Sequence, residues 1–154
     1  MEVIIAVAVI LTVLISAIAL ITFSTAGIRL NKSKIIAVGL AQEGLEIVKN
    51  IRDNNWLQYR RTTDDWLTGL GAGNWRVQYN TESLLAYSSV PLKLDSSGFY
   101  QYSSGSNAPF YRRINIQNIN EDQIKVVAEV TWTENGRSQL ISSEARYYNW
   151  LKEE

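Results

Sequence analysis

The sequence predicts an α+β protein in which one long N-terminal helix packs, through its second half, on a C-terminal antiparallel β-sheet. Three observations lead to this prediction. Residues 3–28 carry no charged side chain, residues 29–55 carry an apolar stripe at helical spacing, and residues 75–150 alternate apolar and polar side chains between turn residues. With 154 residues, the chain has room for one ordinary domain and an appendage.

The composition limits the functions that are open to the chain. Fifteen basic residues balance fifteen acidic ones, so no overall charge favours nucleic acid or anionic lipid. The absence of Cys and His excludes disulfides, thiol nucleophiles, zinc-finger spacing and imidazole acid–base chemistry. No G-x-S-x-G elbow, Walker loop or dinucleotide fingerprint occurs. We therefore expect no enzymatic activity, no catalytic or metal site and no cofactor.

The first element is the apolar segment 1–28. Its core, residues 3–28, is about 40 Å long as a helix, which exceeds the roughly 30 Å hydrocarbon core of a bilayer. The run is longer than the apolar region of a cleaved signal peptide, and neither a preceding basic residue nor an A-x-A site accompanies it. A plain single-pass anchor stays open. It leaves Glu2 unexplained, because a carboxylate beside a membrane segment is costly and generally marks a function.

The sequence of residues 2–10, EVIIAVAVI, resembles the start of mature type IV pilins and of the pseudopilins of type II secretion. In that family one Glu precedes an almost uninterrupted aliphatic helix and is the fifth residue of the mature chain. The resemblance therefore implies three further residues ahead of Met1, and before them a short basic leader that ends in Gly and is removed by a prepilin peptidase. The true mature N-terminus and its N-methylation stay open.

The resemblance also implies a route of assembly. The chain would be inserted in the cytoplasmic membrane, processed, and lifted into an extracellular helical filament by the pilus assembly machinery. Glu2 would pair with the N-terminal amine of a neighbouring subunit, because either charge is costly to bury alone. The residues that would pack in the filament core are Val3, Ile4, Ile5, Val7, Val9 and Ile10. Residues 3–26 lack the Gly and Pro that the family often has here, so local melting of the helix has little support.

Residues 29–55 continue the helix as its amphipathic half. No proline precedes Pro91, so we expect one helix from about residue 2 to about residue 54. Gly39 and Gly44 each cost helix stability, and we interpret both as positions of close packing. The apolar stripe, at steps of three and four, consists of Ala37, Ala41, Gly44, Val48 and Ile51.

Residues 41–56 resemble a segment that is common in pilin-like proteins where the helix meets its globular head. Within it, Glu43 and Glu46 could suggest a paired-carboxylate site. We interpret them as part of a solvated helix face, because no His or metal-ligand cluster lies nearby in the sequence.

The globular head is expected over residues 56–154. A connector loop at 56–74 contains three glycines and the acidic pair Asp64 and Asp65, which by itself does not specify a metal site. In pilins this region corresponds to a variable loop that helps to pack one subunit against the next. The antiparallel sheet follows at 75–150. Its candidate strands are residues 75–79, 90–94, 99–102 and 110–117, with an exposed loop at 103–107.

The strongest local pattern is the last hairpin. Asn135 and Gly136 form the two-residue type I′ turn that such a hairpin requires, which pairs Glu134 with Arg137. The apolar face of the first strand consists of Ile124, Val126, Ala128, Val130 and Trp132. The register then places Val130 opposite Ile141, Val126 opposite Ala145, Ile124 opposite Tyr147 and Glu129 opposite Ser142. Only the second half of the helix offers an apolar stripe to cover this face, which predicts the ladle-shaped fold of type IV pilins.

One group of residues suggests a nucleic-acid surface. Two basic pairs have aromatic neighbours in the sequence, and such a surface could bind single-stranded DNA, which some pili take up. The residues are Arg60, Arg61, Arg112, Arg113, Trp56, Tyr59, Trp66 and Tyr111. We favour the simpler interpretation of exposed Arg beside core aromatics, because the overall charge is balanced.

Three functions therefore follow from the sequence, in order of preference. The first is a pilin, the structural subunit of a homo-oligomeric type IV pilus-like filament. The second is a minor pilin or a type II secretion pseudopilin that primes a short filament. The third is a binding or sensor domain held by a simple membrane tether, which would need neither Glu2 nor a continuous helix.

Overall fold

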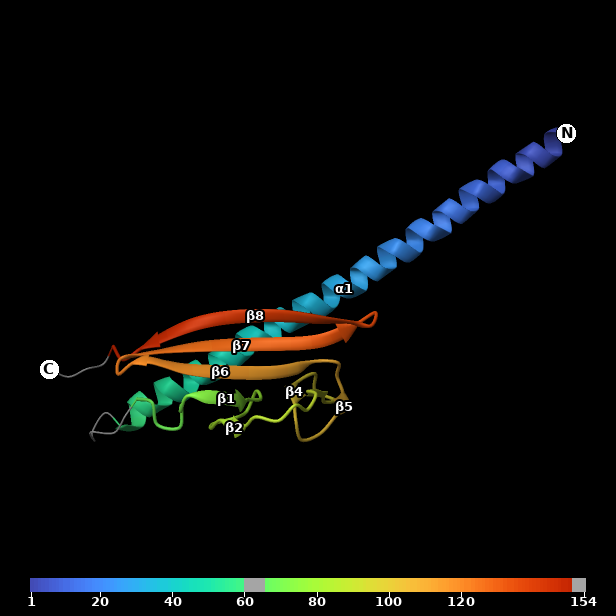
Figure 1. Ribbon diagram of the computed structural model, residues 1–154. Helices are drawn as coiled ribbons and strands as arrows, with labels where there is room; N and C mark the ends of the chain where they lie inside the picture. Colours follow the sequence, from blue (N-terminus) through green and yellow to red (C-terminus); the bar gives the residue numbers. More distant parts are fainter. Residues whose placement is uncertain (60–65, 151–154) are drawn as a thin grey trace. The chain divides into compact units, whose positions relative to one another are not determined.

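The computed structural model describes residues 1–59 and 66–150 (Figure 1). The α-helix α1 (Glu2–Tyr59) is continuous, as expected from an N-terminal half without Gly or Pro at residues 3–26. The chain divides into two compact units, Met1–Ile35 and Ile36–Glu154, and α1 runs through both. The predicted α+β layout, a long N-terminal helix and a C-terminal antiparallel sheet, is confirmed.

The helix continues past its expected end near residue 54. Asn55 does not end α1 because its side chain is used elsewhere: its Nδ2 donates to the carbonyls of Trp66 (3.2 Å) and Thr68 (2.7 Å). Trp56 is buried and stacks on Trp66, with 6.3 Å between ring centroids. These contacts with the segment after residue 65 keep the last turns of α1 helical.

The strands form two antiparallel sheets rather than the one that was expected. The larger sheet has the order β2-β1-β6-β7-β8 and the smaller one the order β4-β3-β5. The strands of the larger sheet are β1 (Gly73–Arg76), β2 (Leu85–Ala86), β6 (Tyr111–Asn120), β7 (Gln123–Glu134) and β8 (Arg137–Tyr148). Those of the smaller sheet are β3 (Lys93–Leu94), β4 (Tyr100–Gln101) and β5 (Ser106–Asn107).

The strand β5 occupies the last two residues of the loop predicted at 103–107, so the loop was predicted too long, whereas the predicted exposure of all five residues is confirmed. Gly105 precedes β5 with a φ of +114°, and a Cβ there would lie 2.4 Å from the Leu94 carbonyl oxygen. Only glycine allows the backbone to approach β3 this closely. The approach lets Ser106 pair with Leu94.

The register of the last hairpin is confirmed in every predicted pair. Glu134 pairs with Arg137, and the four pairs derived from it are Val130 with Ile141, Val126 with Ala145, Ile124 with Tyr147 and Glu129 with Ser142. Asn135 and Gly136 have φ values of 51° and 73°, as a type I′ turn requires. The turn therefore fixes which side chains of β7 and β8 face the core.

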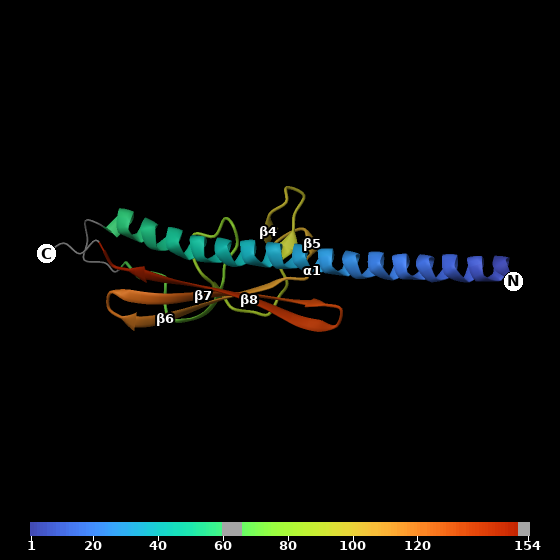
Figure 2. The same ribbon diagram turned by 90° about the horizontal axis from the view of Figure 1, so that it is seen from above.

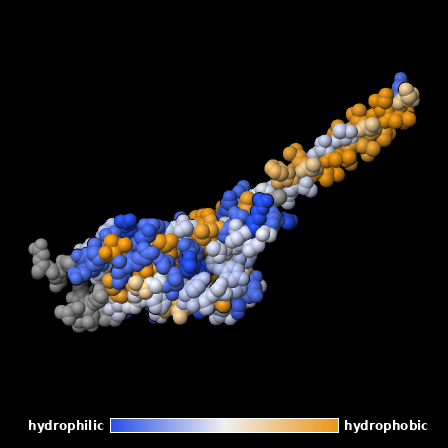
Figure 3. Space-filling model, viewed as in Figure 1, coloured by the Kyte–Doolittle hydropathy of each residue, from blue (hydrophilic) through white to orange (hydrophobic). Residues whose placement is uncertain are grey.

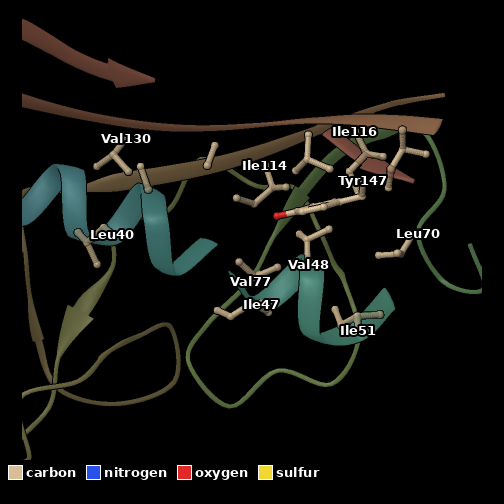
Figure 4. Close-up of a cluster of buried hydrophobic side chains, with 14 of the residues drawn as sticks. Leu40, Ile47, Val48, Ile51, Leu70, Val77, Ile114, Ile116, Val130 and Tyr147 are labelled. Carbon is tan, nitrogen blue, oxygen red and sulfur yellow. The ribbon is translucent and has the colours of Figure 1, made fainter. Parts of the chain in front are cut away.

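The core of the second unit lies between the second half of α1 and β6 to β8, which Figure 2 shows as two layers. All five residues of the predicted helical stripe are buried, and so is the whole apolar face of β7. Figure 4 shows Val48 and Ile51 of the stripe and Val130 of β7 within this core. A Cβ on Gly44 would lie 2.8 Å from Cδ1 of Ile114, so close packing at Gly44 is confirmed. At Gly39 the prediction is wrong for this chain, because no described atom lies within 4 Å of such a Cβ.

Candidate functional site

The predicted assembly residues all lie at the start of α1. Glu2 is the first residue of the helix, a position at which the helix dipole favours a negative charge. The six predicted packing residues, Val3, Ile4, Ile5, Val7, Val9 and Ile10, are between 50% and 75% exposed. They lie around the helix rather than on one side, because residues 2–10 make about two and a half turns. Any assembly that buries them must therefore enclose this part of the helix.

The segment that follows Glu2 presents an apolar surface. No charged residue occurs between Glu2 and Arg29, and all described side chains among residues 1–29 are exposed (Figure 3). This stretch of α1 is long and apolar enough to span a membrane. Apolar surface of this extent is unusual in a soluble monomer and indicates contact with lipid or with other protein.

The hydroxyl groups of the segment do not interrupt this surface. Thr12 Oγ1 donates to the Ala8 carbonyl and Ser16 Oγ to the Thr12 carbonyl, each over 2.8 Å. Thr25 Oγ1 donates to the Ile21 carbonyl in the same way. This back-bonding satisfies these three hydroxyl donors without water.

In the second unit, Arg112 of β6 joins three parts of the head. Its Nη1 donates to the Leu40 carbonyl and to Glu43 Oε1, both at 3.0 Å, and its Nη2 donates to the Val77 carbonyl. The Arg112 side chain is completely buried and Glu43 is partly buried. The two terminal nitrogens of the buried guanidinium are paired in this way, whereas Nε is buried without a hydrogen-bond partner among the described residues.

The predicted exposure of Arg112 was therefore wrong. The predicted solvated face is confirmed at Glu46, which is exposed, and only in part at Glu43, whose side chain is 32% exposed and pairs with Arg112. Arg112 has the same strand parity as Ile114 and Ile116, which are also buried. That alternation along β6 was a signal in the sequence that could have placed Arg112 on the core face.

A second set of contacts joins the end of α1 to β8. The Arg52 guanidinium lies 4.5 Å from the Trp56 ring centroid and 4.8 Å from that of Tyr147, and it also pairs with Asp53 at 2.6 Å. Tyr147 Oη donates to the Leu45 carbonyl over 2.7 Å. Burial of this phenol raises the pKa of Tyr147 to about 12.

Among the residues considered for DNA binding, those whose side chains the structure describes do not form one surface. Trp56, Trp66 and Arg112 are buried, whereas Arg113 and Tyr111 are exposed on the other face of the sheet. Arg113 pairs with Glu129 of β7. Arg60, Arg61, Asp64 and Asp65 lie outside the described residues.

Comparisons of this chain with protein-family models, with curated proteins and with solved structures give no match. The resemblance to type IV pilins therefore rests on residues 2–10, on residues 41–56 and on the α+β layout.

Proposed function

We propose that this chain is the structural subunit of an extracellular type IV pilus-like filament. Residues 1–28 of α1 hold it in the cytoplasmic membrane first and then pack with the same segment of other copies in the filament core. One observation carries the proposal: a single carboxylate, Glu2, directly precedes a long, uncharged and exposed stretch of helix. A bilayer and a bundle of identical helices are the two environments in which such a surface is stable.

The continuity of α1 favours a filament over a simple tether. The helix that carries the exposed apolar segment is also the helix whose residues Ala37 to Ile51 line the core of the head. A simple membrane tether would need only a short linker between the apolar segment and the head. In a filament, a continuous helix lets the packing of the apolar segments transmit force directly to each head.

Glu2 has a defined role in this proposal. In the membrane it lies at the end of the helix, close to water, so it costs the single subunit little. In the filament it would enter an apolar bundle, where its carboxylate would pair with the N-terminal amine of a neighbouring subunit. Removing one member of such a buried pair costs about 3 to 5 kcal/mol, and the loss would recur at every subunit.

The test compares Glu2→Ala with the matched variant Glu46→Ala in a host that supplies a pilus assembly machinery. Glu46 is an exposed carboxylate on the same helix but outside the apolar segment. We expect Glu2→Ala to remain in the membrane fraction with a folded head and to yield few or no sheared filaments. Glu46→Ala should give normal filament yield.

Two results would separate the alternatives. Normal filament yield from Glu2→Ala would remove the role given to Glu2 and favour the tethered domain. Filaments that are short, or that form only together with another pilin, would favour a minor pilin or a pseudopilin.

A further inference from the structure

The strand β8 forms one edge of the five-stranded sheet. All twelve of its residues pair with β7, and no strand among residues 1–59 and 66–150 pairs with its other side. The opposite edge of the sheet is β2, which has only two residues. The sheet therefore has one short edge and one long open edge.

The turn determines which backbone groups of β8 are open. In a two-residue hairpin the residues that flank the turn exchange both hydrogen bonds, so the odd-numbered residues of β8 direct their N–H and C=O groups towards β7. The hydrogen bond from Asn149 N to the Asp122 carbonyl (2.9 Å) continues this phase beyond the strand. The open groups are those of the six even-numbered residues, all of which are exposed: Ser138, Leu140, Ser142, Glu144, Arg146 and Tyr148.

This edge lacks most of the features that prevent strand pairing. Proteins protect edges with short strands, proline, bulges, charged side chains on the edge strand or charges that point towards the core side. β8 contains no proline, its register with β7 has no shift, and its core-facing side chains from Gln139 to Tyr147 are uncharged. Its charged residues, Arg137, Glu144 and Arg146, therefore decide which strand can be added.

We propose that β8 pairs antiparallel with β8 of a second copy of this chain, around a two-fold axis at Ala145. In this register Glu144 lies opposite Arg146 of the second copy, and the symmetry repeats the pair. Oppositely charged side chains that face each other across two strands stabilise the pairing. Ser142 lies opposite Tyr148 of the second copy by the same rule.

The charges select this register over its neighbours. An axis at residue 144 would place two Glu144 carboxylates opposite each other, and an axis at residue 146 would place two Arg146 guanidinium groups opposite each other.

Both charged residues can accept a second partner. Within one chain, Glu144 Oε2 pairs with Lys125 Nζ at 2.9 Å, and Glu144 Oε1 lies 3.6 Å from Arg146 Nε. The pairing with Lys125 lowers the pKa of Glu144, so the carboxylate is ionised. Dimerisation would extend this small network across the axis.

The edge contact does not depend on the filament. A two-fold contact is isologous and cannot repeat along a polar helical filament, so it would join copies in separate filaments or outside a filament. Its test therefore succeeds or fails separately from the test of Glu2.

The experiment uses the full chain in detergent micelles and introduces single cysteines, since the natural sequence has none. In Ala145→Cys the two cysteines would form a pair that is not hydrogen-bonded, with Cα atoms about 4.5 Å apart, which suits a disulfide. Ser143→Cys is the matched control, on the same strand and face. Its two copies would lie about 14 Å apart, too far for a disulfide.

We expect mild oxidation to convert Ala145→Cys, but not Ser143→Cys, into a covalent dimer. Adding Arg146→Glu to Ala145→Cys should reduce the dimer yield about tenfold, because Glu144 would then face a second carboxylate. Adding Glu144→Arg as well should restore it, with circular dichroism showing that all variants are folded. Equal yields for positions 143 and 145, no dimer at either, or failure of the double charge reversal would overturn the proposal.

Discussion

Two helical glycines give opposite predictions for the same substitution. In a helix interior, Gly→Ala gains about 1 kcal/mol of stability when the added methyl group meets open space. Gly39 has that space, since no described atom lies within 4 Å of a Cβ built there. At Gly44 the Cβ would lie 2.8 Å from Ile114 Cδ1, 3.4 Å from Arg112 Cδ and 3.6 Å from Ala128 Cβ.

The magnitude follows from these contacts. Ile114 is fully buried and cannot move without disturbing its neighbours, and overpacking of this kind costs about 1 to 3 kcal/mol. After the helical gain is subtracted, Gly44→Ala should destabilise the head by up to about 2 kcal/mol. Gly39→Ala should stabilise it by about 1 kcal/mol. The two variants therefore differ by about 1 to 3 kcal/mol.

The assay unfolds a fragment comprising residues 29–154 with urea and monitors the unfolding by tryptophan fluorescence. A third variant identifies the contact: Ile114→Val removes the Cδ1 atom that a Cβ at Gly44 would meet. The double variant Gly44→Ala with Ile114→Val should be more stable than the sum of the single changes predicts. If Gly44→Ala were as stable as Gly39→Ala, the packing of α1 on β6 would be different from that described.

Two further predictions concern the same head. Trp132→Ala should destabilise the head by about 3 to 5 kcal/mol, because Trp132 is buried on the core face of β7. In the same urea titration, Thr133→Ala, at the exposed neighbouring position, should change stability by less than about 0.5 kcal/mol. Alkaline pH should also weaken the fold, since burial raises the pKa of Tyr147 from 10.0 to about 12 and the unfolded chain releases this proton first. Tyr147 should not affect the pH dependence of stability below pH 10, and stability should fall as the pH rises from 10 towards 12. If stability fell equally steeply in a Tyr147→Phe variant, Tyr147 would not be the group responsible.

The sequence predicted those parts of the fold that depend on local chemistry. The Asn135 and Gly136 turn determined the register of β7 and β8, and the three-and-four spacing from Ala37 to Ile51 identified the buried face of α1. Both patterns act over a few residues, where turn geometry and side-chain periodicity are sufficient. The apolar segment could likewise be located from local evidence, its uncharged composition.

The parts that were not predicted depend on contacts between distant residues. Arg112 is buried because Leu40 and Val77 direct carbonyl oxygens at it, and neither is near it in the sequence. The two-residue strands β2 and β5 are too short to show any alternation. The extra turns of α1 depend on the contacts of Asn55 with Trp66 and Thr68. The assembly role of Glu2 and the six residues around it stays a prediction.

Electron cryomicroscopy of material sheared from the surface of cells that express this chain tests the central claim most directly. The account predicts helical filaments built from this chain. Residues 2–28 of every copy should pack as a continuous helix around the filament axis, and residues 36–150, which contain the second half of α1 and the sheets, should lie on the outside. A chain that stays entirely in the membrane fraction and yields no filament in a host with a working assembly machinery would contradict it. A filament whose core is formed by the heads, with the apolar segments left outside it, would contradict it equally.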